Sequence, residues 1–155
     1  MSPATMGFMY IFLVACTVTV TWATIYDIPF RSCRGIPGPS AIKVNCSSFE
    51  RETCTLTKGQ TYSIWANFTP QINVNAVQSS VAWKTWVEMP LPGQDADGCN
   101  GYLECPLAQN TPTTFTYPLQ IQNFWMRRRY PIVWRLKDAN TDIKILCFTF
   151  KILIT

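Results

Sequence analysis

The 155-residue chain contains no histidine, and this absence excludes several kinds of catalytic site. Ser-His-Asp and Cys-His nucleophiles and most catalytic zinc sites need an imidazole. The chain also lacks the Cys-x-x-Cys spacing of structural zinc sites. Paired carboxylates could still cleave glycosides, but the carboxylates lie among turn residues, where they usually meet water. These are Asp95, Asp97, Glu104, Asp138 and Asp142. The sequence therefore predicts a protein that is not an enzyme and that has no metal and no cofactor.

Charge is also sparse, because only 14% of the residues are Asp, Glu, Lys or Arg and the net charge is +4. The basic residues do not interleave with a nucleic-acid-binding motif, so we expect no nucleic-acid partner. Closely spaced Pro29, Gly35, Pro37, Gly38 and Pro39 exclude a helix of ordinary length near the start of the chain.

The first 23 residues contain no charged side chain, and their apolar run over residues 6–20 is shorter than the roughly 20 residues of a membrane span. Thr21 and Ala23 are small residues at the two positions that a signal peptidase inspects. We therefore predict a secretory signal over residues 1–23 and one domain over residues 24–155, in the extracellular space or the lysosomal lumen. A retained N-terminal anchor is the alternative.

Cysteines are the strongest structural signal in the predicted domain. Cys16 falls in the signal, which leaves six: Cys33, Cys46, Cys54, Cys99, Cys105 and Cys147. An even number in an exported domain of this size predicts three disulfides, although spacing alone leaves many pairings open. Short local bridges across 46–54 and 99–105 are plausible, and Cys33 would then bond Cys147.

Alternating apolar and polar residues predict strands rather than helices. The expected strands cover residues 54–57, 61–69, 81–89, 113–121, 130–137 and 143–154. Residues 58–60 form a tight turn that would make 54–57 an antiparallel partner of 61–69. Residues 93–112 read as an exposed loop. The fold class is therefore all-β, an immunoglobulin-like antiparallel β-sandwich of about seven strands. Asn67-Phe68-Thr69 is a glycosylation acceptor, with Asn67 on the polar face of its strand.

Several short motifs, taken together, resemble one known family. They are Cys33, Cys46 and Cys54 before Leu56-Thr57-Lys58-Gly59-Gln60-Thr61-Tyr62-Ser63, Asn67-Phe68-Thr69, Pro90-x-Pro92, Asp97-Gly98-Cys99 with Cys105-Pro106, Trp134-x-Leu136-x-Asp138, and Cys147. The chain resembles the MD-2-related lipid-recognition (ML) family, and within it the Niemann-Pick type C2-like secreted sterol and lipid carriers, including arthropod members. The resemblance implies two sheets that splay apart to hold a lipid, with disulfides 33–147, 46–54 and 99–105.

The resemblance also implies which inward side chains line a lipid pocket, whereas composition alone favours a filled core. The candidate ligand-binding residues are Tyr62, Ile64, Phe68, Trp83, Val87, Ile121, Trp125 and Phe148. Counting back from Trp134 places Ile121 and Trp125 at the gate of the family's pocket. The aromatic that the sterol carriers have after Pro-x-Pro is missing here, which favours a fatty acid or another slender ligand over cholesterol. Burying about 350 Å² of lipid supplies roughly 9 kcal/mol of transfer energy, so we expect no need for a polar contact.

Two functions are compatible with these observations. The first is a monomeric carrier of a sterol, fatty acid or other apolar small molecule, which would deliver it to a lipid-accepting receptor or membrane. The second is a co-receptor in innate immunity that binds microbial glycolipid, as in other branches of the family. Arg127-Arg128-Arg129 follows the gate and could contact an anionic head group or an acidic membrane surface, or form a solvated loop.

Overall fold

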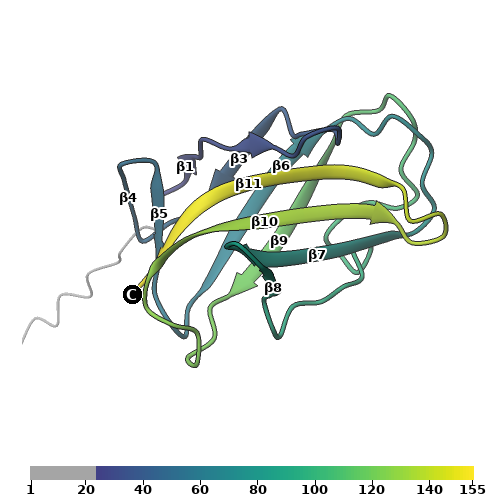
Figure 1. Cartoon of the computed structure of the whole chain (residues 1–155). Helices are drawn as coiled ribbons and strands as arrows, with labels where there is room; N and C mark the ends of the chain where they lie inside the picture. Colours follow the sequence, from purple (N-terminus) through teal and green to yellow (C-terminus); the bar gives the residue numbers. More distant parts are fainter. Residues whose placement is uncertain (1–23) are drawn as a thin grey trace, which may run out of the picture.

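Two β-sheets make up the regular structure of residues 24–155, the part of the chain that the computed structural model describes (Figure 1). The predicted signal over residues 1–23 lies outside the described residues. The smaller sheet has the order β1-β3-β6-β9. Its strands are β1 (Tyr26–Asp27), β3 (Ala41–Val44), β6 (Thr61–Phe68) and β9 (Thr113–Gln120), and all neighbours are antiparallel.

The larger sheet has the order β4-β5-β11-β10-β7-β8, and β2 also pairs with β11. Its strands are β2 (Arg31–Ser32), β4 (Ser48–Glu50), β5 (Thr53–Leu56), β7 (Val77–Lys84), β8 (Glu88–Pro90), β10 (Arg129–Asp138) and β11 (Lys144–Ile154). Figure 1 shows β7, β10 and β11 crossing in front of β6 and β9. Seven of the strands have at least four residues, and the described residues contain no helix, which confirms the predicted all-β sandwich.

The predicted hairpin between residues 54–57 and 61–69 is wrong. β5 belongs to the larger sheet, where it pairs in parallel with β11 and antiparallel with β4, whereas β6 belongs to the smaller sheet. The turn at residues 57–60 therefore carries the chain from one sheet to the other. Gly59 allows this because its φ of +75° is a conformation that other residues rarely adopt.

The predicted strand over residues 81–89 is also two elements rather than one. β7 ends at Lys84, the chain bends, and β8 returns as its antiparallel neighbour with Trp83 opposite Met89. Thr85 Oγ1 donates a hydrogen bond to Val87 O and closes this turn. As a result Val87 is 47% exposed and does not face the interior, which corrects its predicted place in the pocket lining.

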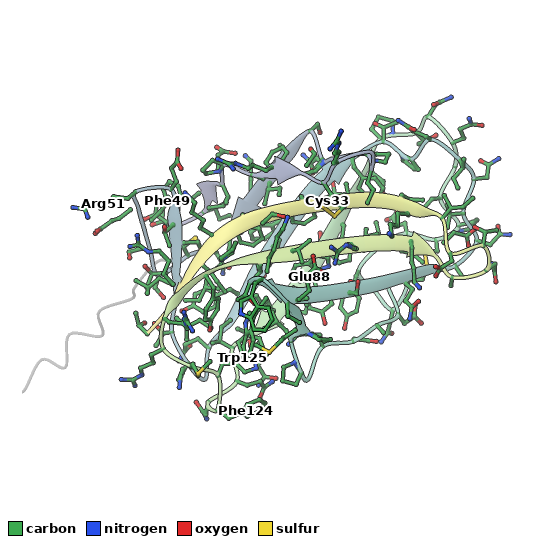
Figure 2. All side chains as sticks on the ribbon, viewed as in Figure 1. Cys33, Phe49, Arg51, Glu88, Phe124 and Trp125 are labelled. Atoms are coloured by element: carbon green, nitrogen blue, oxygen red, sulfur yellow. A yellow bond between two sulfur atoms is a disulfide. The ribbon has the colours of Figure 1, made fainter. Side chains whose placement is uncertain are left out.

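All three predicted disulfides are present: Cys33–Cys147, Cys46–Cys54 and Cys99–Cys105. Cys147 packs with Ala82 and Val133 on the outer side of the larger sheet, apart from the main core. Cys33 N donates a hydrogen bond to Cys147 O at 3.3 Å beside the bridge. The longest bridge therefore fastens the N-terminal segment across the back of β11, where Figure 2 labels Cys33.

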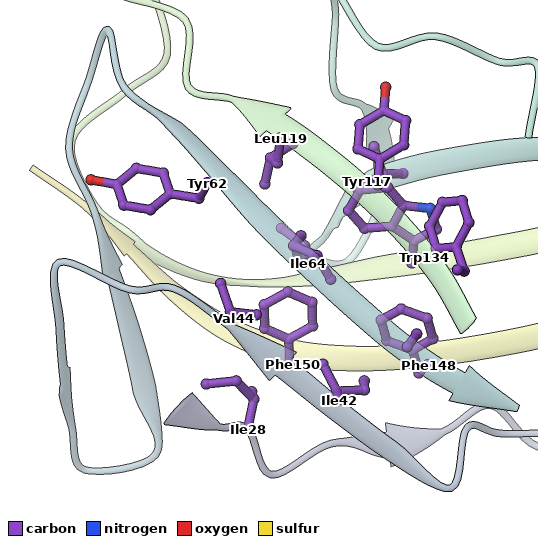
Figure 3. Close-up of a cluster of buried hydrophobic side chains, with 14 of the residues drawn as sticks. Ile28, Ile42, Val44, Tyr62, Ile64, Tyr117, Leu119, Trp134, Phe148 and Phe150 are labelled. Atoms are coloured by element: carbon purple, nitrogen blue, oxygen red, sulfur yellow. The ribbon is translucent and has the colours of Figure 1, made fainter. Parts of the chain in front are cut away.

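The main core fills the space between the sheets, because strands of both sheets point every second residue inward. Tyr117 of β9 meets Trp134 of β10 with ring centroids 4.9 Å apart, and Trp134 stacks on Phe148 of β11 at 6.4 Å. Figure 3 shows these rings together with Ile64 of β6. No helix among the described residues is long and apolar enough to span a bilayer.

Candidate functional site

Seven of the eight candidate ligand-binding residues lie in or against the main core. Tyr62, Ile64, Phe68, Ile121, Trp125 and Phe148 are buried members of this core, and Trp83 is partly buried against it. Val87 is the exception described above. The sequence therefore identifies the interior face of the sandwich correctly, except where the strand containing Val87 ends early.

An aromatic cluster of Trp83, Trp125 and Tyr130, which we call the gate cluster, closes one end of the interior. Trp83 lies near the end of β7, Tyr130 at the start of β10, and Trp125 in the loop between β9 and β10. The centroid of Trp83 is 6.2 Å from that of Trp125 and 5.4 Å from that of Tyr130. Figure 2 shows Trp125 beneath the ribbons at this end, with its neighbour Phe124 pointing away.

Backbone hydrogen bonds fasten both ends of the loop over residues 121–128, which we call the gate loop. Gly59 N donates to Ile121 O at 2.8 Å, and Ile121 N donates to Gln60 O at 2.9 Å. At the other end, Ile154 N donates to Arg128 O at 3.1 Å. Between these anchors, Phe124 and Met126 are 68% and 53% exposed, whereas Trp125 is only 1% exposed. The loop thus holds one indole ring inward between two exposed neighbours.

The interior is closed around the candidate residues. Ile64, Ile121 and Phe148 have no accessible surface, so no open cavity lies against these three side chains. The hollow that the resemblance implies between the sheets is therefore not open beside them. A ligand reaches these residues only if side chains or sheets move apart, which interior packing normally resists.

A groove of about 690 Å³ lies elsewhere, on the outer side of the larger sheet. Strands β2, β7, β10 and β11 contribute to its walls. The side chains are Arg31 of β2, Lys84 at the end of β7, Pro131 of β10, and Thr149 and Lys151 of β11. Lys151 there pairs with Glu52 at 3.3 Å. The groove is open and partly charged, so it is a different environment from the apolar interior.

Three tyrosines place their rings inside and their hydroxyls at the margin of the sheets. Tyr62 Oη accepts a hydrogen bond from Thr57 N at 2.8 Å, and Tyr117 Oη accepts one from Asp95 N at 2.7 Å. Tyr130 Oη donates to Met126 O at 2.8 Å. Burial raises the pKa of Tyr117, and it raises the pKa of Tyr130 to about 12. These two hydroxyls therefore stay neutral at physiological pH, and they add aromatic surface to the interior without adding charge.

A family model described as the ML domain matches residues 27–154. The chain belongs to the ML-domain family. Among its relatives is NPC intracellular cholesterol transporter 2 of Bos taurus, which is 25% identical over 150 residues that cover 96% of this chain and 95% of the bovine protein. The Sus scrofa protein of the same name is 27% identical over 148 residues, covering 92% of this chain and 97% of its own.

The crystal structure of a Niemann-Pick type C2 protein from the Japanese carpenter ant has the same fold as this ML domain. The TM-score is 0.72 at 20% sequence identity, and the match covers 83% of this chain and 100% of the ant chain. The predicted fold is therefore confirmed independently of the strand assignment.

Sequence reasoning missed several residues that line the interior of this ML domain. Phe115, Tyr117 and Leu119 of β9 are 0–3% exposed and alternate with residues that are less buried. This period of two is visible in the sequence and could have identified them. Tyr130 of the gate cluster, at the start of the expected strand over residues 130–137, is also absent from the candidate residues. Its contact with Trp83 depends on the register of β10 against β7, which the sequence does not reveal.

Two surface predictions fall on exposed residues. Asn67 projects from β6, where its side-chain oxygen accepts a hydrogen bond from Thr114 Oγ1 at 2.9 Å, and its glycosylation stays a prediction. Arg127, Arg128 and Arg129 are all exposed beside the gate loop's second anchor, and their contact with an anionic surface also stays a prediction.

The described residues contain no group of three His, Cys, Asp or Glu side chains that could hold a metal ion.

Proposed function

We propose that this ML domain is a secreted lipid carrier without catalytic activity, which takes up one sterol, fatty acid or similar apolar molecule between its sheets. The observation that carries the proposal is the continuous apolar interior, which contains Trp134 and reaches the gate cluster, where Trp125 of the gate loop packs against Trp83 of β7. The curated relatives named cholesterol transporters support the lipid class.

The closed interior sets the energetics of the proposed uptake. Transfer of about 350 Å² of lipid surface supplies roughly 9 kcal/mol, from which association and the opening of packed contacts must be subtracted. A micromolar affinity already requires about 8 kcal/mol of binding free energy, so opening of the interior must cost little for the proposal to hold. We expect opening to occur at the gate loop, which is fastened at its two anchors and by the hydrogen bond from Tyr130 Oη to Met126 O between them.

The first test identifies the ligand directly. Protein purified after secretion is extracted with organic solvent, and the extract is analysed by mass spectrometry. We expect about one sterol or fatty acid per protein molecule. Acylated glycolipid together with a stably co-purifying protein partner would instead indicate the co-receptor function.

The second test uses displacement of the fluorescent hydrocarbon diphenylhexatriene by candidate lipids. We expect Trp125→Ser to weaken lipid binding by at least about tenfold, because it removes the ring that closes the interior. Trp86→Ser is the matched control, since Trp86 is 97% exposed on the β7–β8 turn. Circular dichroism shows that both variants are folded. Equal binding by wild type and Trp125→Ser would remove Trp125 from the gate, and a folded wild type that binds neither probe nor lipid would disprove the proposed function.

A further inference from the structure

Two polar atoms in the gate cluster have no hydrogen-bond partner. Nε1 of Trp83 and Nε1 of Trp125 are both buried, and neither has a hydrogen-bond partner among the described residues. Trp125 as a whole is 1% exposed, so bulk water does not reach its indole. Both donors belong to rings whose centroids are 6.2 Å apart at an interplanar angle of 80°.

An unpartnered buried donor is unfavourable, because it loses its hydrogen bond to water and gains nothing in return. The same sandwich satisfies its other buried aromatic donors. Trp134 Nε1 donates to Ser79 Oγ at 2.9 Å, and Tyr130 Oη, within the gate cluster, donates to Met126 O at 2.8 Å. The two open donors are thus confined to the place where the interior is closed by a loop.

We infer that the indole N–H groups of Trp83 and Trp125 recognise an oxygen acceptor at the polar end of the lipid, an inference that rests on the proposed carrier function. An indole N–H only donates, so its complement is a hydroxyl, carbonyl or carboxylate oxygen. The rest of the ligand then extends from the gate cluster along the apolar core toward Trp134. This assigns the ligand an orientation, and it replaces the expectation that no polar contact is needed.

The inference separates ligands by chemistry rather than by size. An alkane and the primary alcohol of the same chain length bury nearly the same apolar surface, but only the alcohol offers an acceptor to the two indoles. Dodecane and 1-dodecanol form such a pair. Each is used to displace diphenylhexatriene from the wild type and from a variant with Trp83→Phe and Trp125→Phe, which keeps both positions aromatic but removes both N–H groups.

We expect the double variant to bind 1-dodecanol about tenfold more weakly than the wild type, while its affinity for dodecane changes by less than about twofold. The inference is overturned if both affinities fall by the same factor, or if neither falls. Those results leave the carrier function standing, because dodecane and the probe still bind. If the wild type binds neither lipid nor the probe, it is the carrier function that fails.

The free energy of unfolding provides a second measurement, which separates a role of the two N–H groups in ligand binding from a role in stabilising the fold. Replacing Trp by Phe removes buried ring volume at either position, but here it also removes an N–H that has no partner, so each replacement in the ligand-free double variant should lower the free energy of unfolding by less than the control does. The control, Trp134→Phe, deletes a satisfied bond to Ser79 and should lower stability without changing the ratio of alcohol to alkane affinity. In ¹⁵N-labelled protein, the two indole resonances should shift downfield with 1-dodecanol and not with dodecane. Unshifted resonances would contradict the assignment.

Discussion

Asp138 lies at the end of β10, where its carboxylate accepts hydrogen bonds from Asn140 N at 3.0 Å and Thr141 Oγ1 at 2.7 Å. The sequence placed it among turn carboxylates that meet water, but the residue is buried. These hydrogen bonds, the one from Asn140 N foremost, lower the pKa of Asp138 below its usual 3.8. The charged carboxylate therefore orders the turn that leads into β11.

The direction of the Asp138 pKa shift determines how the stability of the protein depends on pH. Because the folded pKa is lowered, the stabilisation is fully present above the unfolded value of 3.8 and is lost as the pH falls through the folded pKa. We expect Asp138→Asn to unfold at a lower temperature than the wild type at pH 7, and the gap to narrow below 3.8. Thermal unfolding followed by circular dichroism measures both. A gap that stays unchanged below pH 3.8 would contradict the assignment.

Single residues also show where sequence reasoning stops. The inward positions Ile64, Trp134 and Phe148 follow from alternation alone, because a strand places every second side chain on the same face. The open indoles of Trp83 and Trp125 do not, since a missing partner depends on which acceptors the fold brings near. No pattern in the sequence predicts that the indole N–H of Trp134 donates to Ser79 whereas that of Trp125 has no acceptor.

At the scale of elements, the longest strands were predictable and the connections were not. β6 and β9 agree with the predicted strands to within two residues, because their alternation is long and uninterrupted. The bend over residues 85–87 contains Thr, Trp and Val, which all favour strands, so the local sequence does not predict a bend there. The change of sheet at residues 57–60 has the sequence of an ordinary hairpin turn. Only pairing between strands far apart in the sequence, such as β5 with β11, distinguishes a change of sheet from a hairpin.

The turn at residues 57–60 provides a prediction because Gly59 supports the gate loop. A Cβ at Gly59 would lie 3.2 Å from Asn123 Oδ1, and the φ of +75° is strained for any other residue. We expect Gly59→Ala to cost roughly 1 to 2 kcal/mol of unfolding free energy and to alter lipid affinity by displacing the gate loop. Urea denaturation and probe displacement measure the two effects.

Gly101→Ala is the matched control for this substitution. Gly101 has a φ of +78°, but a Cβ at this residue would meet no heavy atom within 4 Å, so the variant reproduces the backbone strain without the contact to the gate loop. Its lipid affinity should equal that of the wild type. An equal change of affinity in both variants would show that the turn does not support the gate loop.

At the scale of the whole molecule, the disulfides lie outside the part of the apolar interior that we propose opens for a ligand. Cys33–Cys147 ties the N-terminal segment to the back of the larger sheet, and Cys46–Cys54 joins the segment before β4 to β5. Neither bridge crosses the gate cluster. None of the six bonded cysteines belongs to the gate loop or the gate cluster, so both are held by noncovalent contacts.

The exposed arginines at that same end predict how the ligand is handed over. Arg127, Arg128 and Arg129 extend from the gate loop into β10, so an anionic bilayer that attracts them would meet the molecule close to its gate. A basic residue near such a surface contributes about 1 kcal/mol, and salt screens it. We expect replacement of all three by Ser to slow lipid transfer to anionic vesicles about tenfold at low salt, and to leave transfer to neutral vesicles unchanged.

A variant of equal charge loss separates location from net charge in this experiment. Arg34, Lys43 and Lys144 are exposed and lie outside the gate loop, on the N-terminal segment, β3 and the start of β11. If the arginines act by orienting the gate toward the bilayer, replacing these three by Ser should slow transfer far less, and high salt should abolish the difference between the two variants. If both variants slow lipid transfer equally, only the overall positive charge matters. The three arginines would then have no specific role at the membrane and would simply lie in solvent.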